Sequence, residues 1–137
     1  MNLHLMKEVY PGIFMITERG ISGMLKPPVN LYVIPGRDGL IFDGGYGSIC
    51  CIRKFRKEFR EINRICRERG IENRITRIIL SHAHADHFSG LRRLKKRYSL
   101  QIVLTERMCG IISDSKTYRN SYAVKKEKRV RGFLRSL

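Results

Sequence analysis

Four side chains that can bind a metal ion lie within six consecutive residues: His82, His84, Asp86 and His87. Imidazole nitrogens and carboxylate oxygens are the ligands that Zn²⁺ favours at catalytic sites. His82 and His84 alternate, so in an extended segment they project to the same side. Asp86 and His87 follow where the chain begins to turn, and they can face a second, neighbouring position. The spacing therefore predicts up to two Zn²⁺ ions, with Fe or Mn as alternatives, close enough to share a hydroxide.

The sequence on either side of this cluster supports a functional site. Residues 75–80 (ITRIIL) predict a strand buried on both faces, and the GLRRLKKRY segment after the cluster predicts a short helix. Loops at strand ends are where α/β proteins place functional groups. Surface or capping histidines are the alternative explanation, which suits a lone histidine better than a cluster in this setting.

The remaining patterns alternate between strands and helices, which predicts a layered α/β structure. Apolar runs predict strands at residues 3–9, 12–17, 29–34, 40–42 and 101–104, with turns or loops at Pro11-Gly12, 18–28 and 35–39. Apolar residues at spacings of three and four predict a helix over 49–69. Ser48 is its expected N-cap and Gly70 its stop signal. Another helix is expected to begin at residues 106–112.

The motif and the segment that precedes it resemble a known family. The SHAHADH segment, Ser81 to His87, is similar to the HxHxDH signature of the metallo-β-lactamase superfamily, with serine where threonine is more usual. The preceding NLYVIPGRDGLIFDGGYG segment resembles the family's opening hairpin. The resemblance covers roughly residues 7–112. It implies an αββα sandwich of which this chain supplies about the N-terminal half, a mixed sheet with helices on one face. We expect this part to span 1–124, followed by a basic tail at 125–137 that is not native to the family.

The resemblance also implies a role for each site residue. His82 and His84 would bind the first metal, and Asp86 and His87 the second. Asp86 would also act in catalysis by orienting or deprotonating the attacking water. Asp43 would orient the motif loop from behind the ligands; the alternative is an ordinary turn aspartate. In the family, metal-bound hydroxide attacks an ester, thioester, amide or phosphodiester.

The family's site needs further ligands: a third histidine for the first metal, a bridging aspartate and another histidine. No histidine follows His87 in this sequence, and Asp114, the only later aspartate, has the character of a loop or capping residue. The four cysteines, Cys50, Cys51, Cys66 and Cys109, lack zinc-type spacing. We therefore expect a truncated and incomplete site, in a gene fragment, a frameshifted product or one part of a split protein.

Charge and composition leave several functions open. The leading hypothesis is a zinc hydrolase of a small ester- or thioester-like substrate. The formal net charge of +16 favours the alternative of a nuclease acting on RNA or DNA, although nucleic acid is not the favoured partner. A third alternative is a non-catalytic remnant or interaction module that self-associates or binds a second half-domain. No signal sequence or membrane-length apolar run is present, and the cysteines fit a reduced compartment, so we expect a cytoplasmic protein without a membrane partner.

Overall fold

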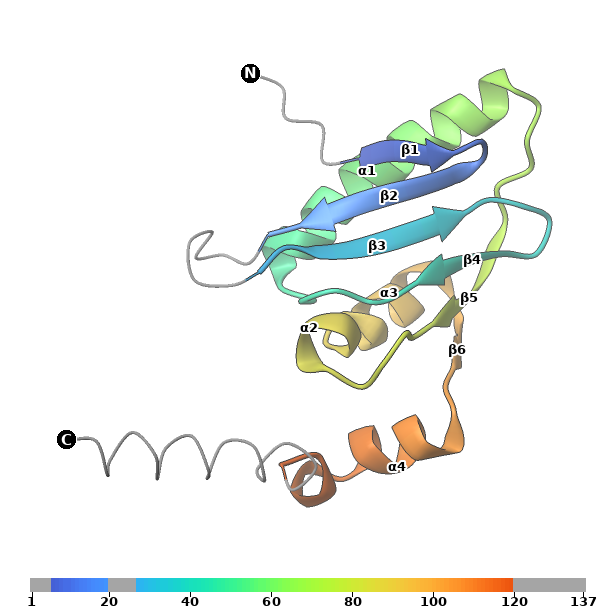
Figure 1. Cartoon of the computed structure of the whole chain (residues 1–137). Coiled ribbons are helices and arrows are strands. Elements are labelled where there is room, and N and C mark those ends of the chain that lie inside the picture. The colour runs from blue at the N-terminus through green and yellow to red at the C-terminus, as the bar shows by residue number, and fades with distance from the viewer. Residues whose placement is uncertain (1–5, 20–26, 120–137) are drawn as a thin grey trace. The chain divides into compact units, whose positions relative to one another are not determined.

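A computed structural model describes residues 6–19 and 27–119, in two compact units, Met1–Val103 and Leu104–Leu137. The first unit is built on a six-stranded mixed sheet whose strands follow one another in chain order (Figure 1). The strands are β1 (Met6–Tyr10), β2 (Ile13–Glu18), β3 (Val29–Ile34), β4 (Gly39–Phe42), β5 (Ile75–Ile79) and β6 (Gln101–Val103). β1 to β4 pair antiparallel, whereas β4, β5 and β6 pair parallel. The predicted mixed sheet is confirmed.

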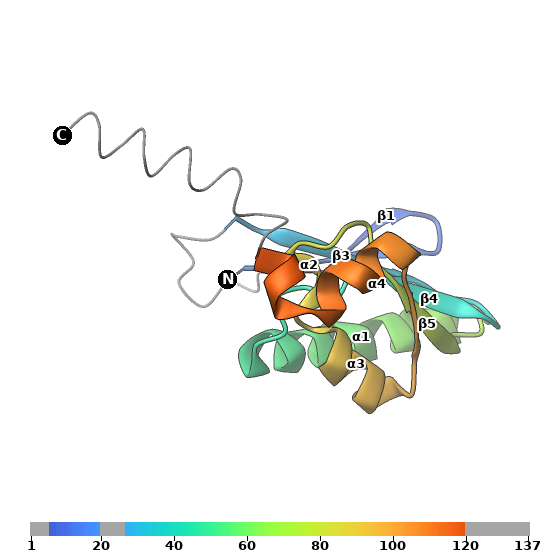
Figure 2. The ribbon, with the colours of Figure 1, turned by 90° about the horizontal axis from the view of Figure 1, so that it is seen from below.

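The connections explain this change in strand direction. Short turns join β1 to β2, at Gly12, whose φ is +78°, and β3 to β4, at residues 35–38. Parallel neighbours need a crossover, and helix α1 (Ile49–Glu68) connects β4 to β5, while α2 (Ala85–Phe88) and α3 (Leu91–Tyr98) connect β5 to β6. Right-handed crossovers in the same direction place their helices on the same face of the sheet. α1 and α3 accordingly lie on one side of it (Figure 2).

Helix α1 forms where the apolar spacing predicts it. The Ser48 hydroxyl accepts a hydrogen bond from the Cys51 backbone amide at 3.1 Å, as expected of an N-cap. The helix ends at Glu68, and Gly70 then adopts the left-handed conformation, with φ +66°. The apolar stripe packs against the sheet and against α3, where Phe59 lies 5.0 Å from Tyr98 between ring centroids.

On one face of the sheet, the central strands β2 to β5 are buried beneath these helices. Phe14, Val33, Ile41 and Ile78 are successive partners across β2, β3, β4 and β5, and each is 0% exposed. We call this set the covered row. Its four large side chains remove several hundred Å² of apolar surface from water, which is the main source of stability in a domain of this size.

The other face of the same sheet is only half-buried. Met15, Tyr32, Phe42 and Ile79 are cross-strand partners one residue away from the covered row, and all have intermediate exposure. We call this set the open row. The expectation that strand 75–80 would be buried on both faces is therefore wrong for this chain, in which Ile78 is buried and Ile79 is not. The reason is that α1 and α3 both cover the same side.

The second unit contains α4 (Glu106–Ser113), which the sequence predicts, and Thr105 caps it by accepting from the Met108 amide at 3.2 Å. Asp114 accepts from the Thr117 amide at 2.7 Å, so it is a capping residue, as expected. Within residues 6–19 and 27–119, no helix combines the length and apolar character needed to cross a bilayer. The expected basic tail at 125–137, most of the 18–28 loop and the start of strand 3–9 lie outside the described residues.

Candidate metal centre

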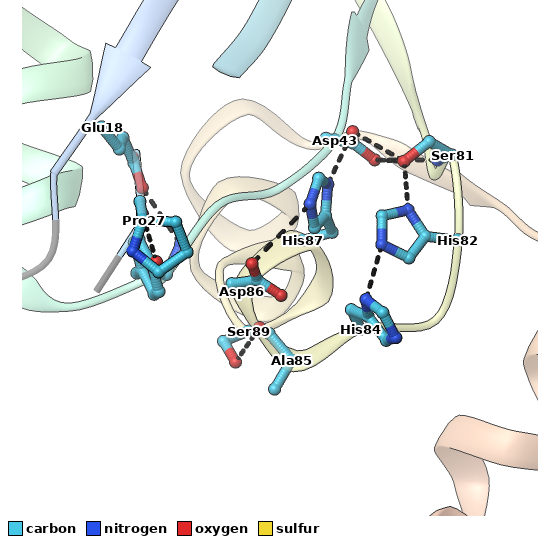
Figure 3. Close-up of polar contacts among 11 residues, drawn as sticks. Glu18, Pro27, Asp43, Ser81, His82, His84, Ala85, Asp86, His87 and Ser89 are labelled. Carbon is cyan, nitrogen blue, oxygen red and sulfur yellow. Dashed lines mark hydrogen bonds and ion pairs between the residues drawn. The ribbon is translucent and has the colours of Figure 1, made fainter. Parts of the chain in front are cut away.

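The candidate metal-binding motif occupies the loop that leads from the carboxyl end of β5 into the short helix α2 (Figure 3). Its three imidazole rings lie together: the ring centroids of His82 and His84 are 4.4 Å apart, and those of His82 and His87 are 4.1 Å apart. Asp86 lies in the first turn of α2, next to His87. The loop thus brings all four predicted ligands to one end of the sheet.

The potential donor atoms of this loop are arranged in two pairs. His82 Nε2 lies 2.9 Å from His84 Nδ1, and His87 Nε2 lies 3.8 Å from Asp86 Oδ2. Two nitrogens on one tetrahedral Zn²⁺ would be about 3.3 Å apart, given Zn–N distances of about 2.0–2.1 Å. In this structure the first pair is hydrogen-bonded, so one of its two nitrogens carries a proton. The pair would fit a shared metal after loss of that proton and an opening of a few tenths of an ångström. No group of three or more such side chains converges on one position within the described part of the chain.

Asp43 holds this loop from behind. Its carboxylate is buried, and it accepts hydrogen bonds from the Ser81 amide and from His87 Nδ1, both at 2.8 Å. The backbone of Asp43 has φ +69°, a conformation that aspartate tolerates better than most residues. The turn also bonds to β5, because the Asp43 amide donates to the Ile79 carbonyl at 2.8 Å. Asp43 is thus a structural anchor of the loop as well as a turn residue.

Ser81 connects Asp43 to the first histidine. Its hydroxyl oxygen lies within 2.9 Å of both Asp43 carboxylate oxygens and 2.8 Å from His82 Nδ1. If the hydroxyl donates its one proton to Asp43, its oxygen can accept from His82 Nδ1–H. His82 then carries its proton on Nδ1, as His87 does when it donates to Asp43, so both rings present Nε2 as a lone-pair donor. Sequence reasoning noted Ser81 merely as a departure from threonine.

The motif loop is also fixed by a close approach of two glycine segments. The Gly44 amide donates to the His87 carbonyl at 2.6 Å, and the Gly90 amide donates to the Gly45 carbonyl at 3.2 Å. A Cβ atom on Gly90 would lie 1.9 Å from the Gly44 carbonyl oxygen, so a larger residue cannot stand there without moving the backbone. Glycine at these positions allows the turn after β4 to touch the end of α2.

Glu18 supports the same turn and was missed by sequence reasoning. It is 2% exposed at the end of β2, and its Oε2 accepts from the Tyr46 amide at 3.0 Å. Burial raises its carboxyl pKa, and the Tyr46 hydrogen bond opposes that shift in part. The signal was present in the sequence, because the alternation that buries Phe14 and Ile16 places Glu18 on the same face.

The electrostatics of the loop favour the neutral form of the His82 ring. Partial burial lowers the pKa of His82, and the neighbouring His87 and His84 rings lower it further, against the opposing effect of Asp43. A neutral ring is the form that binds a metal ion. The cysteines are not part of this arrangement: Cys66 is buried on α1, as expected of a core residue, and burial raises the pKa of its thiol.

Comparison with known proteins identifies the class of protein. The sequence model of the Metallo-beta-lactamase superfamily matches residues 26–107, which is more than half of the chain and includes the whole motif loop. The chain belongs to this superfamily, a family of metal-dependent hydrolases. Comparison with curated proteins gave no match.

Solved structures that share this fold include several metallo-beta-lactamases. They include DIM-1, with 17% identity and a TM-score of 0.56, over 81% of this chain and 46% of that one. They also include the enzyme from Pontibacter korlensis, with 12% identity and a TM-score of 0.57, over 81% and 47%. A Cronobacter sakazakii protein with a HARLDQ motif has 17% identity and a TM-score of 0.51, over 77% and 36%. The chain therefore spans less than half the length of these proteins, and at this identity the likeness extends to the fold alone.

Proposed function

We propose that this chain is the N-terminal, ligand-bearing part of a zinc hydrolase that acts on a small ester- or thioester-like substrate. His82 and His84 would hold one Zn²⁺, and Asp86 and His87 a second. The observation that carries the proposal is the pairing of these donors, with His82 Nε2 and His84 Nδ1 2.9 Å apart. Zn²⁺ supplies Lewis acidity and lowers the pKa of a bound water to about 7.

The chain's own residues have separate tasks in this proposal. Asp43 and Ser81 keep the Nδ1 protons of His87 and His82 in place, so that Nε2 of each ring stays available. Asp86 is the proposed catalytic carboxylate, because its side chain is 30% exposed in the first turn of α2 and can accept a proton from the attacking water.

We further propose that a second half-domain covers the open row and completes the site. A half-exposed apolar sheet face favours association. The related structures are more than twice as long as the segments that this chain matches in them. The two donor pairs provide only two protein ligands per metal, whereas catalytic zinc sites usually have three. Self-association through the open row is the competing outcome, and sedimentation of the purified chain distinguishes the two.

Zinc titration by calorimetry tests the metal assignment. The wild-type chain is compared with His82→Ala/His84→Ala and with His4→Ala, which removes the only histidine outside the motif. We expect the double variant to lose the tighter binding event, with at least a tenfold fall in affinity, and His4→Ala to match the wild type. Unchanged zinc affinity in the double variant would contradict the assignment.

A second candidate is hydrolysis of phosphodiesters, which the basic surfaces of α1 and α3 favour. Parallel assays with p-nitrophenyl acetate, a thioester and bis(p-nitrophenyl) phosphate separate the two candidates. We expect weak turnover by the isolated chain in every assay, because a hydroxide held by two ligands per metal is poorly positioned. Robust zinc-dependent turnover by a verified monomer would contradict the need for a second half.

A further inference from the structure

Helix α1 carries a stripe of positive charge on the side away from the sheet. The basic residues recur at spacings of three and four, which places them on one helical face opposite the buried residues. They are Arg53, Arg56, Lys57, Arg60, Arg64 and Arg67. From the first to the last, the stripe is about 21 Å long, given a rise of about 1.5 Å per residue.

Helix α3 extends this stripe sideways. Tyr98 packs edge-on against Phe55 and lies 5.0 Å from Phe59 between ring centroids, which fixes α3 beside the middle of α1. Burial raises the pKa of the Tyr98 hydroxyl, and the charges of Arg97, Arg56 and Arg60 oppose that shift. These three guanidinium groups therefore lie near enough to one phenol to act on its charge. We call the α1 stripe together with Arg97 the basic face.

The acidic residues of the two helices leave most of this charge unbalanced. Glu58 is buried and 4% exposed, and Glu61 and Glu68 both pair with Arg64. α3 contains no acidic residue. Among the ion pairs formed by residues 6–19 and 27–119, those of the basic face involve Arg64 alone. The other members of the face remain available to an outside anion.

A hollow of about 420 Å³ lies beside the C-terminal half of the basic face. Arg60 and Arg67 line it together with Asn63 and Asn73, whose side-chain amides are hydrogen-bonded to each other at 2.7 Å. Two guanidinium groups and neutral amides around a concave surface suit a phosphate, because guanidinium binds phosphate oxygens in a bidentate manner.

We propose that the basic face binds the phosphate backbone of a nucleic acid, independently of any reaction at the metal centre. Six of its seven members are arginine, and about 21 Å of helix matches about six phosphates of one strand, at about 3.4 Å of axial rise each. An anionic membrane is less suitable, since Ile49 is the one large apolar side chain exposed on α1 in the described structure. The binding depends on charge, so it is independent of base sequence and sensitive to salt.

Fluorescence anisotropy with a short labelled RNA duplex and a DNA duplex of the same sequence tests this proposal over a series of salt concentrations. The test variant is Arg56→Gln/Arg60→Gln/Arg67→Gln. The matched control is Lys7→Gln/Arg37→Gln/Arg74→Gln, which removes the same charge from exposed positions outside the basic face. Glutamine and arginine have similar helix propensities, so α1 is expected to remain folded.

We expect the test variant to reduce the slope of log affinity against log salt by about 2.7, at about 0.9 per lost phosphate contact, and the control to change it little. A third variant, Arg56→Lys/Arg60→Lys/Arg67→Lys, retains the charge and is expected to retain most of the slope. Equal losses in the test and control variants would overturn the proposal. So would binding to anionic phospholipid vesicles with none to either duplex.

Discussion

The two faces of the six-stranded sheet have nearly the same apolar character but different environments. The covered row lies under α1 and α3 and is fully excluded from water, whereas the open row, one residue away on each strand, is half-exposed. Both rows consist of large apolar side chains, so side-chain type alone does not decide which face is buried. The difference is set by the crossover helices, which lie on one side. The open row therefore marks the side on which a further layer can pack.

The largest expected effect is on the covered row. Ile41→Ala leaves a cavity among side chains that are 0% exposed, so we expect the free energy of unfolding to fall by about 2–5 kcal/mol. Urea denaturation followed by circular dichroism measures this change. A loss below about 1 kcal/mol would contradict the assignment of the covered row as the core.

Asp43 follows β4 and is buried beside the candidate metal centre. A substitution there tests whether the buried end of β4 supports metal binding. Asp43→Asn keeps the shape of the side chain but weakens the hydrogen bonds to Ser81 and His87. We expect zinc affinity to fall about 10–100-fold, which is the usual effect of losing a group that orients ligands. Asp38→Asn is the control, because Asp38 lies in an exposed turn at the opposite end of β4. This variant should leave zinc affinity unchanged.

Glu18 is a buried carboxyl on the same face of β2 as Phe14, and its raised pKa gives a stability that depends on pH. The folded state holds the Glu18 proton more tightly than the unfolded state, whose pKa is near 4.5. The stabilising effect of protonation is therefore complete below that value and is lost as pH rises through the folded-state pKa. We expect Glu18→Gln to flatten the fall in stability between acidic and neutral pH. The measurement is the free energy of unfolding as a function of pH. Parallel curves for Glu18→Gln and the wild type would be inconsistent with a buried, titrating carboxyl.

The smallest effect on stability is expected from the open row. Phe42→Gln removes a large apolar side chain that is only half-buried, so the loss should be about 1 kcal/mol or less. Its clearer effect is on association. If copies of the chain associate through the open row, sedimentation at increasing concentration should give a smaller mass for Phe42→Gln than for the wild type. Ile41 and Phe42 are neighbours on β4 that face opposite sides of the sheet. A larger loss of stability from Phe42→Gln than from Ile41→Ala would refute the comparison between the two faces.

Much of the fold could be predicted because its signals are local. The three- and four-residue spacing along α1 and the cap at Ser48 place that helix within one residue of its observed end. The burial of β5 was harder to predict, since the pattern of Ile75 to Leu80 does not reveal that both crossovers pass on the same side. The motif loop was found from residue type and spacing, and its position at the end of β5 follows from the alternation of strand and helix.

The supporting residues of the site were harder to find. The Ser81 hydroxyl lies within hydrogen-bond distance of both Asp43 and His82, but a sequence cannot reveal this position. Glu18 could have been placed on the buried face from the alternation of β2. Its contact with Tyr46 joins residues 28 apart, and depends on how the turn after β4 folds back. Long-range polar contacts of this kind depend on tertiary structure, for which one sequence carries no local pattern.

The anchoring of the motif loop by Asp43 has a consequence for the order of events during folding. Asp43 and Ser81 are separated by 38 positions, and they meet only when β4 and β5 have paired in parallel across α1. Such non-local pairing is slow compared with helix formation. Zinc added during refolding would therefore find oriented ligands only after this step. If zinc binds the native state as proposed, it would then stabilise that state by about 2.7 kcal/mol at a concentration of about 100 times its dissociation constant.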